Sequence, residues 1–111
     1  MSALPLGKEY DDKYYIGFFE NNILVAIIDL IDGYPEKDIV HIGFFMVDVK
    51  YQGIGIGSGI VQHIIGMLKK MGYRKIRLGV DKENPQSYSF WHKNGFDVTK
   101  QSEYVIMEYM L

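Results

Sequence analysis

The stretch Tyr51-Gln52-Gly53-Ile54-Gly55-Ile56-Gly57-Ser58-Gly59 separates two segments of different periodicity. The segment before it, 39–47 (IVHIGFFMV), is almost wholly apolar, which is typical of a strand buried on both faces. After it, apolar residues recur at helical spacing up to Met71, with Ser58 near the start of the helix and Gly72 as its stop. Such a glycine-rich turn can bind phosphate at the helix N-terminus. A tight turn that binds nothing explains the same glycines equally well.

The remaining segments predict one α/β (α+β) domain. Segments 14–19 and 23–31 read as strands of a hairpin joined at Asn21-Asn22, and 75–80, 96–99 and 104–111 read as later strands. Segment 85–94 predicts a short helix with Asn84 as its N-cap and a proline in its first turn. The order β-β-β-α-β-α-β-β indicates a mixed sheet within a single domain over 1–111, preceded by a loose arm at 1–13.

Composition excludes several classes of protein. The chain has 111 residues, no cysteine and 48% hydrophobic residues, and none of its apolar runs approaches the roughly 18 residues of a membrane span. The first 50 residues carry four basic and nine acidic side chains, whereas residues 51–111 carry eight basic and five acidic ones. A pI of about 5.9 argues against a nucleic-acid partner. We expect a cytoplasmic protein with neither a nucleic-acid nor a membrane partner, whose second half suits an anionic ligand.

The sequence contains neither of two common phosphate-binding motifs. A P-loop needs a lysine, and none occurs between Lys50 and Lys69, while the dinucleotide pattern Gly-x-Gly-x-x-Gly fails in every register. What is present is Gln52-x-x-Gly55-x-Gly57, followed by Asn84-x-x-Ser87-x-x-Phe90-Trp91-x-Lys93-x-Gly95-Phe96. These two motifs, in this order, resemble those of the GNAT superfamily of acyl-CoA-dependent N-acetyltransferases, and the resemblance covers about residues 14–111.

The resemblance implies a GNAT-like mixed sheet and a protein that transfers an acetyl group from acetyl-CoA to a primary amine, by direct attack in a ternary complex. It implies that the backbone of the strand at 45–47 pairs with the pantetheine arm, and that backbone N–H groups of the turn surround the pyrophosphate. The cofactor-binding residues expected from it are Phe45, Met46, Val47, Gln52, Gly53, Ile54, Gly55, Ile56, Gly57, Ser58, Asn84 and Trp91. No metal site is expected.

Acetyl transfer to an amine requires a neutral nucleophile and a donor for the developing oxyanion. The resemblance assigns the donor to a backbone N–H near Phe45. His41, six residues before Val47, is the candidate base, and strand alternation places it on the face of Phe45. A histidine that is merely hydrogen-bonded within the sheet is the alternative. The family's frequent tyrosine is Trp91 here, which cannot deliver a proton near neutrality. Tyr88, one helical turn earlier, is the candidate acid, ahead of His92.

A second departure concerns the N-terminus. GNAT domains usually begin with a strand and two helices that contribute to the acceptor site, whereas about 13 residues precede the first strand here. The chain is then expected to be a shortened member, a fragment, or a member whose acceptor wall comes from a partner subunit. We expect exposed apolar strands and a homodimer. Four carboxylates near the second and third strands, Asp29, Asp32, Glu36 and Asp38, are compatible with a cationic acceptor. Two other functions stay open: a non-catalytic acyl-CoA-binding or regulatory module, and an interaction domain whose glycine turn is only structural.

Overall fold

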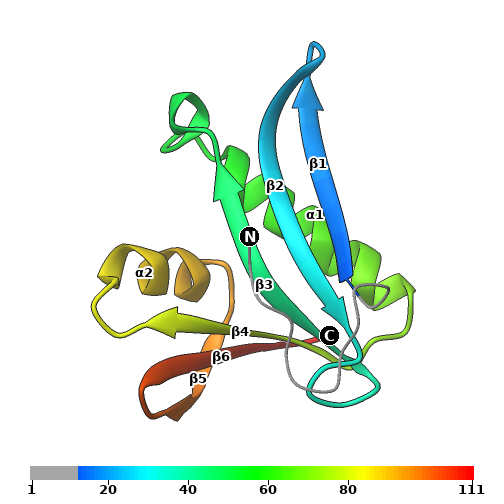
Figure 1. Ribbon diagram of the computed structural model, residues 1–111, viewed down its shortest axis with the longest axis vertical. Helices are drawn as coiled ribbons and strands as arrows, with labels where there is room; N and C mark the ends of the chain where they lie inside the picture. The colour runs from blue at the N-terminus through cyan, green and yellow to red at the C-terminus, as the bar shows by residue number, and fades with distance from the viewer. Residues whose placement is uncertain (1–12) are drawn as a thin grey trace.

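A computed structural model describes residues 13–111, which form a six-stranded sheet with one long and one short α-helix (Figure 1). The strands lie side by side in the order β1-β2-β3-β4-β6-β5, and β3 and β4 are the parallel pair. This arrangement confirms the predicted mixed sheet and element order. The strands are β1 (Lys13–Glu20), β2 (Ile23–Asp32), β3 (Ile39–Val47), β4 (Lys75–Asp81), β5 (Asp97–Gln101) and β6 (Tyr104–Met110), and the helices are α1 (Ile56–Lys70) and α2 (Pro85–Lys93), with a short 3-10 turn, η2 (Val49–Tyr51).

Local chain chemistry sets the turns and helix ends. Asn21 and Asn22 join β1 to β2 with φ of 50° and 67°, a left-handed conformation that asparagine tolerates better than most residues. Gly72, with φ of 93°, follows α1 as predicted. Ser58 does not cap α1: the N-cap is Gly55, and the helix begins at Ile56. The helix starts earlier than predicted because glycine can adopt the left-handed cap conformation that precedes it.

The strands β3 and β4 separate along their length. They pair from Ile39 opposite Lys75 to Ile42 opposite Leu78, and no further pairing joins them, although β3 continues to Val47. Figure 1 shows the two strands diverging beyond this point, with α2 beside the gap. The backbone of β3 therefore has no strand partner on this side past Ile42.

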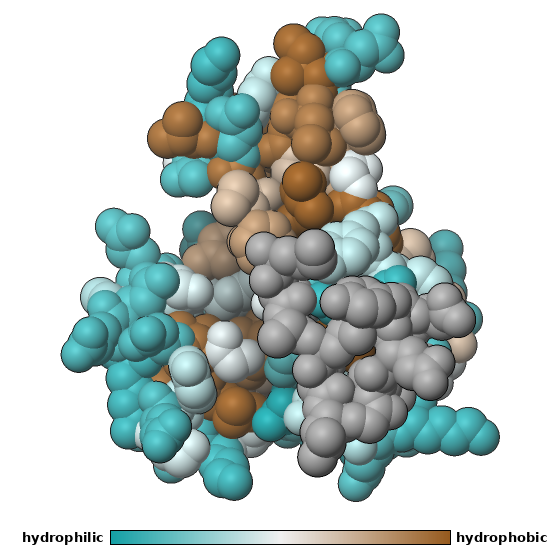
Figure 2. All heavy atoms as spheres, in the orientation of Figure 1, coloured by the Kyte–Doolittle hydropathy of each residue, from teal (hydrophilic) through white to brown (hydrophobic). Residues whose placement is uncertain are grey.

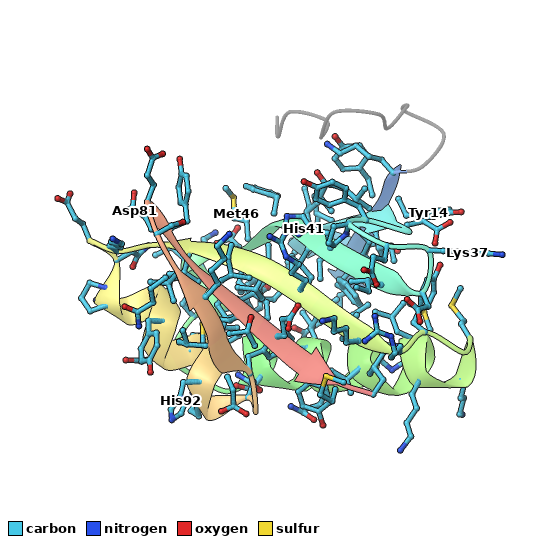
Figure 3. The ribbon with its side chains drawn as sticks, turned by 90° about the horizontal axis from the view of Figure 1, so that it is seen from below. Tyr14, Lys37, His41, Met46, Asp81 and His92 are labelled. Atoms are coloured by element: carbon cyan, nitrogen blue, oxygen red, sulfur yellow. The ribbon has the colours of Figure 1, made fainter. Side chains whose placement is uncertain are left out.

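A β-bulge at Gly43 changes which side chains share a face of β3. Asp29 lies opposite Phe44 and Leu30 opposite Ile42, so the register skips Gly43. Ile42 and Phe45 consequently both pack toward α1, while His41 lies on the other face. The prediction that His41 and Phe45 share a face was wrong, because strict alternation fails at a bulge. Figure 3 shows His41 and Met46 on the side of the sheet away from the helices.

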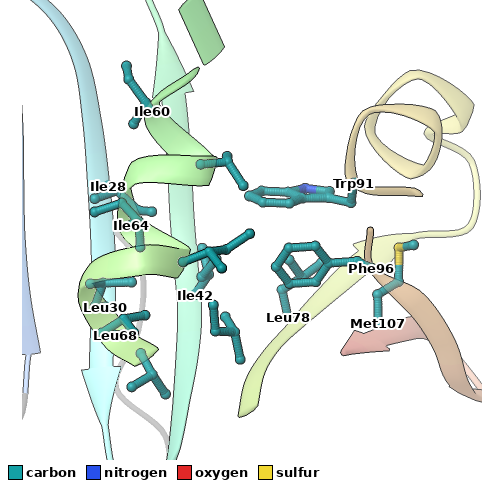
Figure 4. Close-up of a cluster of buried hydrophobic side chains, with 14 of the residues drawn as sticks. Ile28, Leu30, Ile42, Ile60, Ile64, Leu68, Leu78, Trp91, Phe96 and Met107 are labelled. Atoms are coloured by element: carbon teal, nitrogen blue, oxygen red, sulfur yellow. The ribbon is translucent and has the colours of Figure 1, made fainter. Parts of the chain in front are cut away.

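The core lies between α1 and one face of the sheet (Figure 4). Helix α1 contributes five buried residues, and the indole of Trp91 on α2 extends the same cluster toward Phe96 and Met107. The second half of β3 is not buried on both faces as its apolar sequence predicted, since Phe44 and Met46 are exposed. The buried face of α1 consists of Ile60, Val61, Ile64, Ile65 and Leu68.

The predicted arm at 1–13 falls mostly outside the described residues. Its last residue, Lys13, belongs instead to β1, where its ammonium lies 2.9 Å from the buried carboxylate of Asp29. Among the described residues, the helices are too short or too polar for any of them to cross a bilayer.

Candidate active site

A cleft of about 490 Å³ opens where β3 and β4 separate. Its walls come from three parts of the chain: the end of β3, the glycine-rich turn with the start of α1, and one side of α2 from its N-cap Asn84 to its last residue Lys93. The lining residues are Phe45, Val47, Gln52, Gly53, Gly55, Gly57, Ser58, Asn84, Gln86, Ser87, Phe90, Trp91 and Lys93. The two sequence motifs, more than 25 residues apart in the chain, therefore form opposite walls of one cavity.

The glycines of the turn keep this cleft open. Gly53 and Gly55 have φ of 77° and 85°, which residues with a side chain rarely adopt. The first helical hydrogen bond of α1 runs from the N–H of Gly59 to the carbonyl of Gly55, so the N–H groups of the preceding turn have no partner within the helix. A Cβ on Gly57 would lie 3.3 Å from Phe90 Cε1, across the cleft. Free amides at the positive end of a helix suit a phosphate-bearing ligand.

Polar side chains of both motifs hold the walls in place. Gln52 donates through Nε2 to the carbonyl of Val47 at 2.8 Å, which ties the turn to the end of β3. Asn84 accepts the N–H of Ser87 at 3.0 Å and so caps α2. Gln52 and Asn84 therefore both stabilise the local structure of the cleft walls. The predicted role of Gln52 and Asn84 in binding a cofactor stays a prediction.

One residue that the sequence did not single out joins the two helices. Asn94, which is buried at the end of α2, donates through Nδ2 to Ser58 Oγ at 3.2 Å. Its Oδ1 accepts a hydrogen bond from Gln62 Nε2 at 3.3 Å. The C-terminal end of α2 is thereby fixed to the N-terminal part of α1. Gly95, with φ of 96°, marks the helix end in the sequence, but nothing there predicts the partners of Asn94.

Aromatic rings form the floor of the cleft. Trp91 has only 6% of its surface exposed, and its ring centroid lies 5.7 Å from that of Phe45 and 5.1 Å from those of Phe90 and Phe96. The lining side chains Gln86, Ser87, Phe90 and Lys93 were not predicted, although their spacing from Asn84 along one helix gives a signal. Three predicted residues, Met46, Ile54 and Ile56, do not line the cleft.

His41 lies in a cluster of three residues on the opposite face of the sheet. An Nη atom of Arg77 on β4 is 3.3 Å from His41 Nδ1, the Tyr34 ring meets the imidazole edge-on at 5.5 Å, and the guanidinium lies 6.0 Å from the Tyr34 centroid. Burial, together with the positive charge of Arg77, lowers the pKa of His41 to about 4, against a smaller opposing effect of Asp29. The imidazole is therefore neutral at pH 7.

This contact fixes the tautomer of His41. A guanidinium can only donate, so Nδ1 must accept and the ring proton must lie on Nε2. In this arrangement Nε2 is a donor and Nδ1 is already engaged. The assignment of His41 as the base stays a prediction, and it requires that Arg77 be drawn to another partner.

The candidate acid Tyr88 lies apart from the cleft. Its ring stacks on His92 with centroids 5.7 Å apart, and neither residue is among those that line the cavity. Figure 3 shows His92 on the helix side of the molecule, pointing away from the sheet. The role of Tyr88 in proton transfer thus has no geometric support.

The four carboxylates proposed for a cationic acceptor are engaged within the protein. Asp29 is buried beside Lys13, and Asp32 accepts a hydrogen bond from the Tyr73 hydroxyl. The other two, Glu36 and Asp38, both pair with Arg74, at 3.0 and 2.8 Å. Within residues 13–111, no three His, Asp or Glu side chains gather closely enough to hold a metal ion.

Comparison with known proteins agrees with this geometry. Residues 2–96 match the model of the acetyltransferase (GNAT) family, and the chain belongs to that family. The fold is shared with the PaiA N-acetyltransferase of Thermoplasma acidophilum in complex with coenzyme A, at a TM-score of 0.79 and 26% identity over 90% of this chain and 62% of that one. An acetyltransferase of Thermus thermophilus gives a TM-score of 0.84 at 21% identity, over 92% and 66% of the two chains.

Curated relatives are longer than this chain. A spermidine N(1)-acetyltransferase of Thermoplasma acidophilum is 27% identical over 87% of this chain, which spans 54% of that protein. A 5-NmdU N-acetyltransferase of Pseudomonas phage PaMx11 is 29% identical over 61% of this chain and 44% of its own length. The chain thus spans about half the length of these relatives.

Titration of His41 tests the contact with Arg77. We expect a pKa of about 4 in the wild type, and a pKa that moves up toward the ordinary 6.5 in Arg77→Met, because the neighbouring cation is gone while burial stays. Because the pKa of His41 is lower in the folded than in the unfolded state, its contribution to the free energy of unfolding is fully present above pH 6.5. This contribution is lost as the pH drops through 4, and the loss is at most about 3 kcal/mol. NMR of the imidazole protons measures the pKa, and urea unfolding of wild type and His41→Gln measures the loss. A wild-type pKa near 6.5 would contradict the contact.

Proposed function

We propose that the protein is an N-acetyltransferase that moves an acetyl group from acetyl-CoA to a primary amine by direct attack in a ternary complex. The observation that carries this proposal is the cradle of backbone amides from Gly53 to Ser58 at the start of α1, beside the cleft and free of side chains at Gly53 and Gly55. A diphosphate fits such a cradle because every donor is a backbone N–H at a helix N-terminus.

The separation of β3 from β4 supports the binding of the extended arm of acetyl-CoA and the reaction of its thioester. Past Ile42, the β3 backbone has no strand partner on the side of the cleft, so an extended amide-bearing arm can pair with it as an added strand. A backbone N–H near Phe45 would then polarise the thioester carbonyl and stabilise the oxyanion. Lys93, whose ammonium lies 5.8 Å from the Phe90 centroid, adds positive charge to the same wall.

Proton transfer in this reaction needs a base more than an acid. The amine must lose a proton to attack, whereas a leaving thiol with a pKa near 8.5 has little need of an acid. His41 lies on the face opposite α1, one residue before the strands separate, and it is the base that we propose once Arg77 is engaged elsewhere. No side chain of the described cleft is assigned as the acid.

The alternative is a non-catalytic acyl-CoA-binding module. Trp91 at the position of the family's tyrosine, with Tyr88 outside the cleft, favours it. Calorimetry with CoA and release of free thiol from acetyl-CoA, measured with a panel of primary amines, separate the two functions. We expect both binding and amine-dependent thiol release. Binding without release from any amine would favour the module, and no binding would overturn both.

We also propose a homodimer. Five exposed apolar side chains lie near the free end of the β1–β2 hairpin and the adjacent part of β3, and Figure 2 shows apolar residues gathered at the top of the molecule. Such patches mark interfaces. Light scattering should give a dimer at micromolar concentration, and Phe19→Ser with Met46→Ser should shift it toward monomer. A wild-type monomer would contradict the proposal. The five residues are Phe19, Ile23, Leu24, Phe44 and Met46.

A further inference from the structure

The guanidinium of Arg77 differs from the other cations near it in having no carboxylate partner. Lys13, Arg74 and Lys75 each form an ion pair of 2.8 to 3.0 Å with an Asp or Glu. Arg77 forms none with any residue of 13–111, and its polar contact is the neutral His41. Its cross-strand neighbour on β6 is Glu108, whose carboxylate is 3.0 Å from Lys75. Arg77 is half-buried, so its charge is partly desolvated while no carboxylate of residues 13–111 lies within ion-pair distance of it.

The position of Arg77 places this charge beside the proposed site of reaction. Ile76 and Leu78, its neighbours on β4, belong to the core against α1, so Arg77 points to the opposite face. It lies opposite His41 in the parallel register, one residue before β3 and β4 separate. Arg77, His41 and Tyr34 therefore lie together on the face of the sheet away from the helices, next to the point where β3 and β4 separate.

From this juxtaposition, and building on the proposed acetyl transfer, we infer that the acceptor is an amine that also carries an anionic group, a carboxylate or a phosphate, which pairs with Arg77. The planar guanidinium matches either anion with two parallel hydrogen bonds. The nearby acids favour a polyamine less, because Asp29 pairs with Lys13, and Glu36 and Asp38 both pair with Arg74.

Binding of the anionic group to Arg77 would also prepare His41 for proton transfer. An anion on Arg77 competes with His41 Nδ1 for the guanidinium, and it offsets the positive charge that disfavours the imidazolium. Nδ1 then becomes free to accept the proton that the amine loses. An acceptor without the anion leaves Nδ1 engaged, so the anionic group would contribute to turnover as well as to binding.

Matched pairs of amines test this inference. The panel holds ω-amino acids of two to six carbons with their carboxamides, phosphoethanolamine with ethanolamine, and spermidine. The acids vary the spacing between amine and anion, and phosphoethanolamine separates phosphate from carboxylate. We expect kcat/KM for the best anionic member to exceed that of its neutral twin at least about tenfold, as for other hydrogen bonds to charged groups. Equal values, or a preference for spermidine, would overturn the inference.

Variants of Arg77 test whether this residue causes the preference for anionic amines. Arg77→Met should bring the ratio within each pair to about twofold or less, with the KM for acetyl-CoA unchanged, and Arg77→Lys should restore part of it. Arg74→Met is the matched control, because Arg74 pairs with Glu36 and Asp38 on the exposed surface, and it should keep the wild-type ratio. A preference that survives in Arg77→Met would overturn the role of Arg77.

A binding measurement separates this inference from the proposed function. In the presence of CoA, the best anionic amine should shift the His41 imidazole resonances of the wild type and leave those of Arg77→Met unchanged. If it does so while no amine is acetylated, the function fails and the anion site stands. If amines are acetylated without any such shift or preference, the function stands and the anion site is overturned.

Discussion

Replacing Gly57 by leucine should weaken CoA binding strongly while the fold persists. A Cβ at this position lies 3.3 Å from Phe90 Cε1 and 3.5 Å from Val47 Cγ2, and both side chains line the cleft. The rest of the leucine side chain would extend into the space between them. We expect the Kd for CoA, measured by calorimetry, to rise at least about 100-fold, which is ~2.8 kcal/mol at 1.4 kcal/mol per tenfold.

Gly59→Leu is the matched control for this experiment. Gly59 lies two residues further along α1, and a Cβ there meets nothing within 4 Å. Both variants gain the same helix propensity over glycine, about 0.8–1 kcal/mol, so a general effect on α1 appears in both. The Kd of Gly59→Leu should stay within about twofold of wild type. Equal affinity in Gly57→Leu and wild type would show that CoA does not occupy this cleft.

Features set by neighbouring residues could be predicted from the sequence. The cap at Asn84, the stop at Gly72 and the turn at Asn21-Asn22 each depend on the chemistry of a few adjacent residues, and the structure has all three. The resemblance of the two glycine- and asparagine-containing motifs to the GNAT pattern implied that both take part in cofactor binding, and in the structure both line one cleft.

Features that depend on pairing between distant segments could not be predicted. The bulge at Gly43 arises only when β3 pairs with β2, and it reverses the face that alternation assigns to His41. The contacts between His41 and Arg77, and between Ser58 and Asn94, each join residues 36 positions apart. The sequence offered His41 as a candidate base but did not point to Arg77, which contacts it, because neither strand alone determines the register of β3 on β4.

The other large effect is expected from Trp91→Ala. Trp91 is the single residue of α2 that is buried, and its ring contacts those of Phe45, Phe90 and Phe96. Removing a buried tryptophan costs about 3–5 kcal/mol, which is a large part of the 5–15 kcal/mol that holds a typical domain together. Urea unfolding should show this loss, and α2 should lose its attachment to the sheet.

Two further variants show what the indole contributes. His92→Ala, at an exposed neighbouring position, should change stability by no more than about 0.5 kcal/mol. Trp91→Tyr keeps an aromatic ring and supplies the hydroxyl that the family often has there, so a rise in kcat with acetyl-CoA and a good acceptor would show that the missing acid limits the wild type. An unchanged kcat would mean that the thiolate leaves without help. A loss below about 1 kcal/mol in Trp91→Ala would contradict the packing of α2 described above, because Trp91 is its one fully buried residue and Phe90 packs against the core only in part.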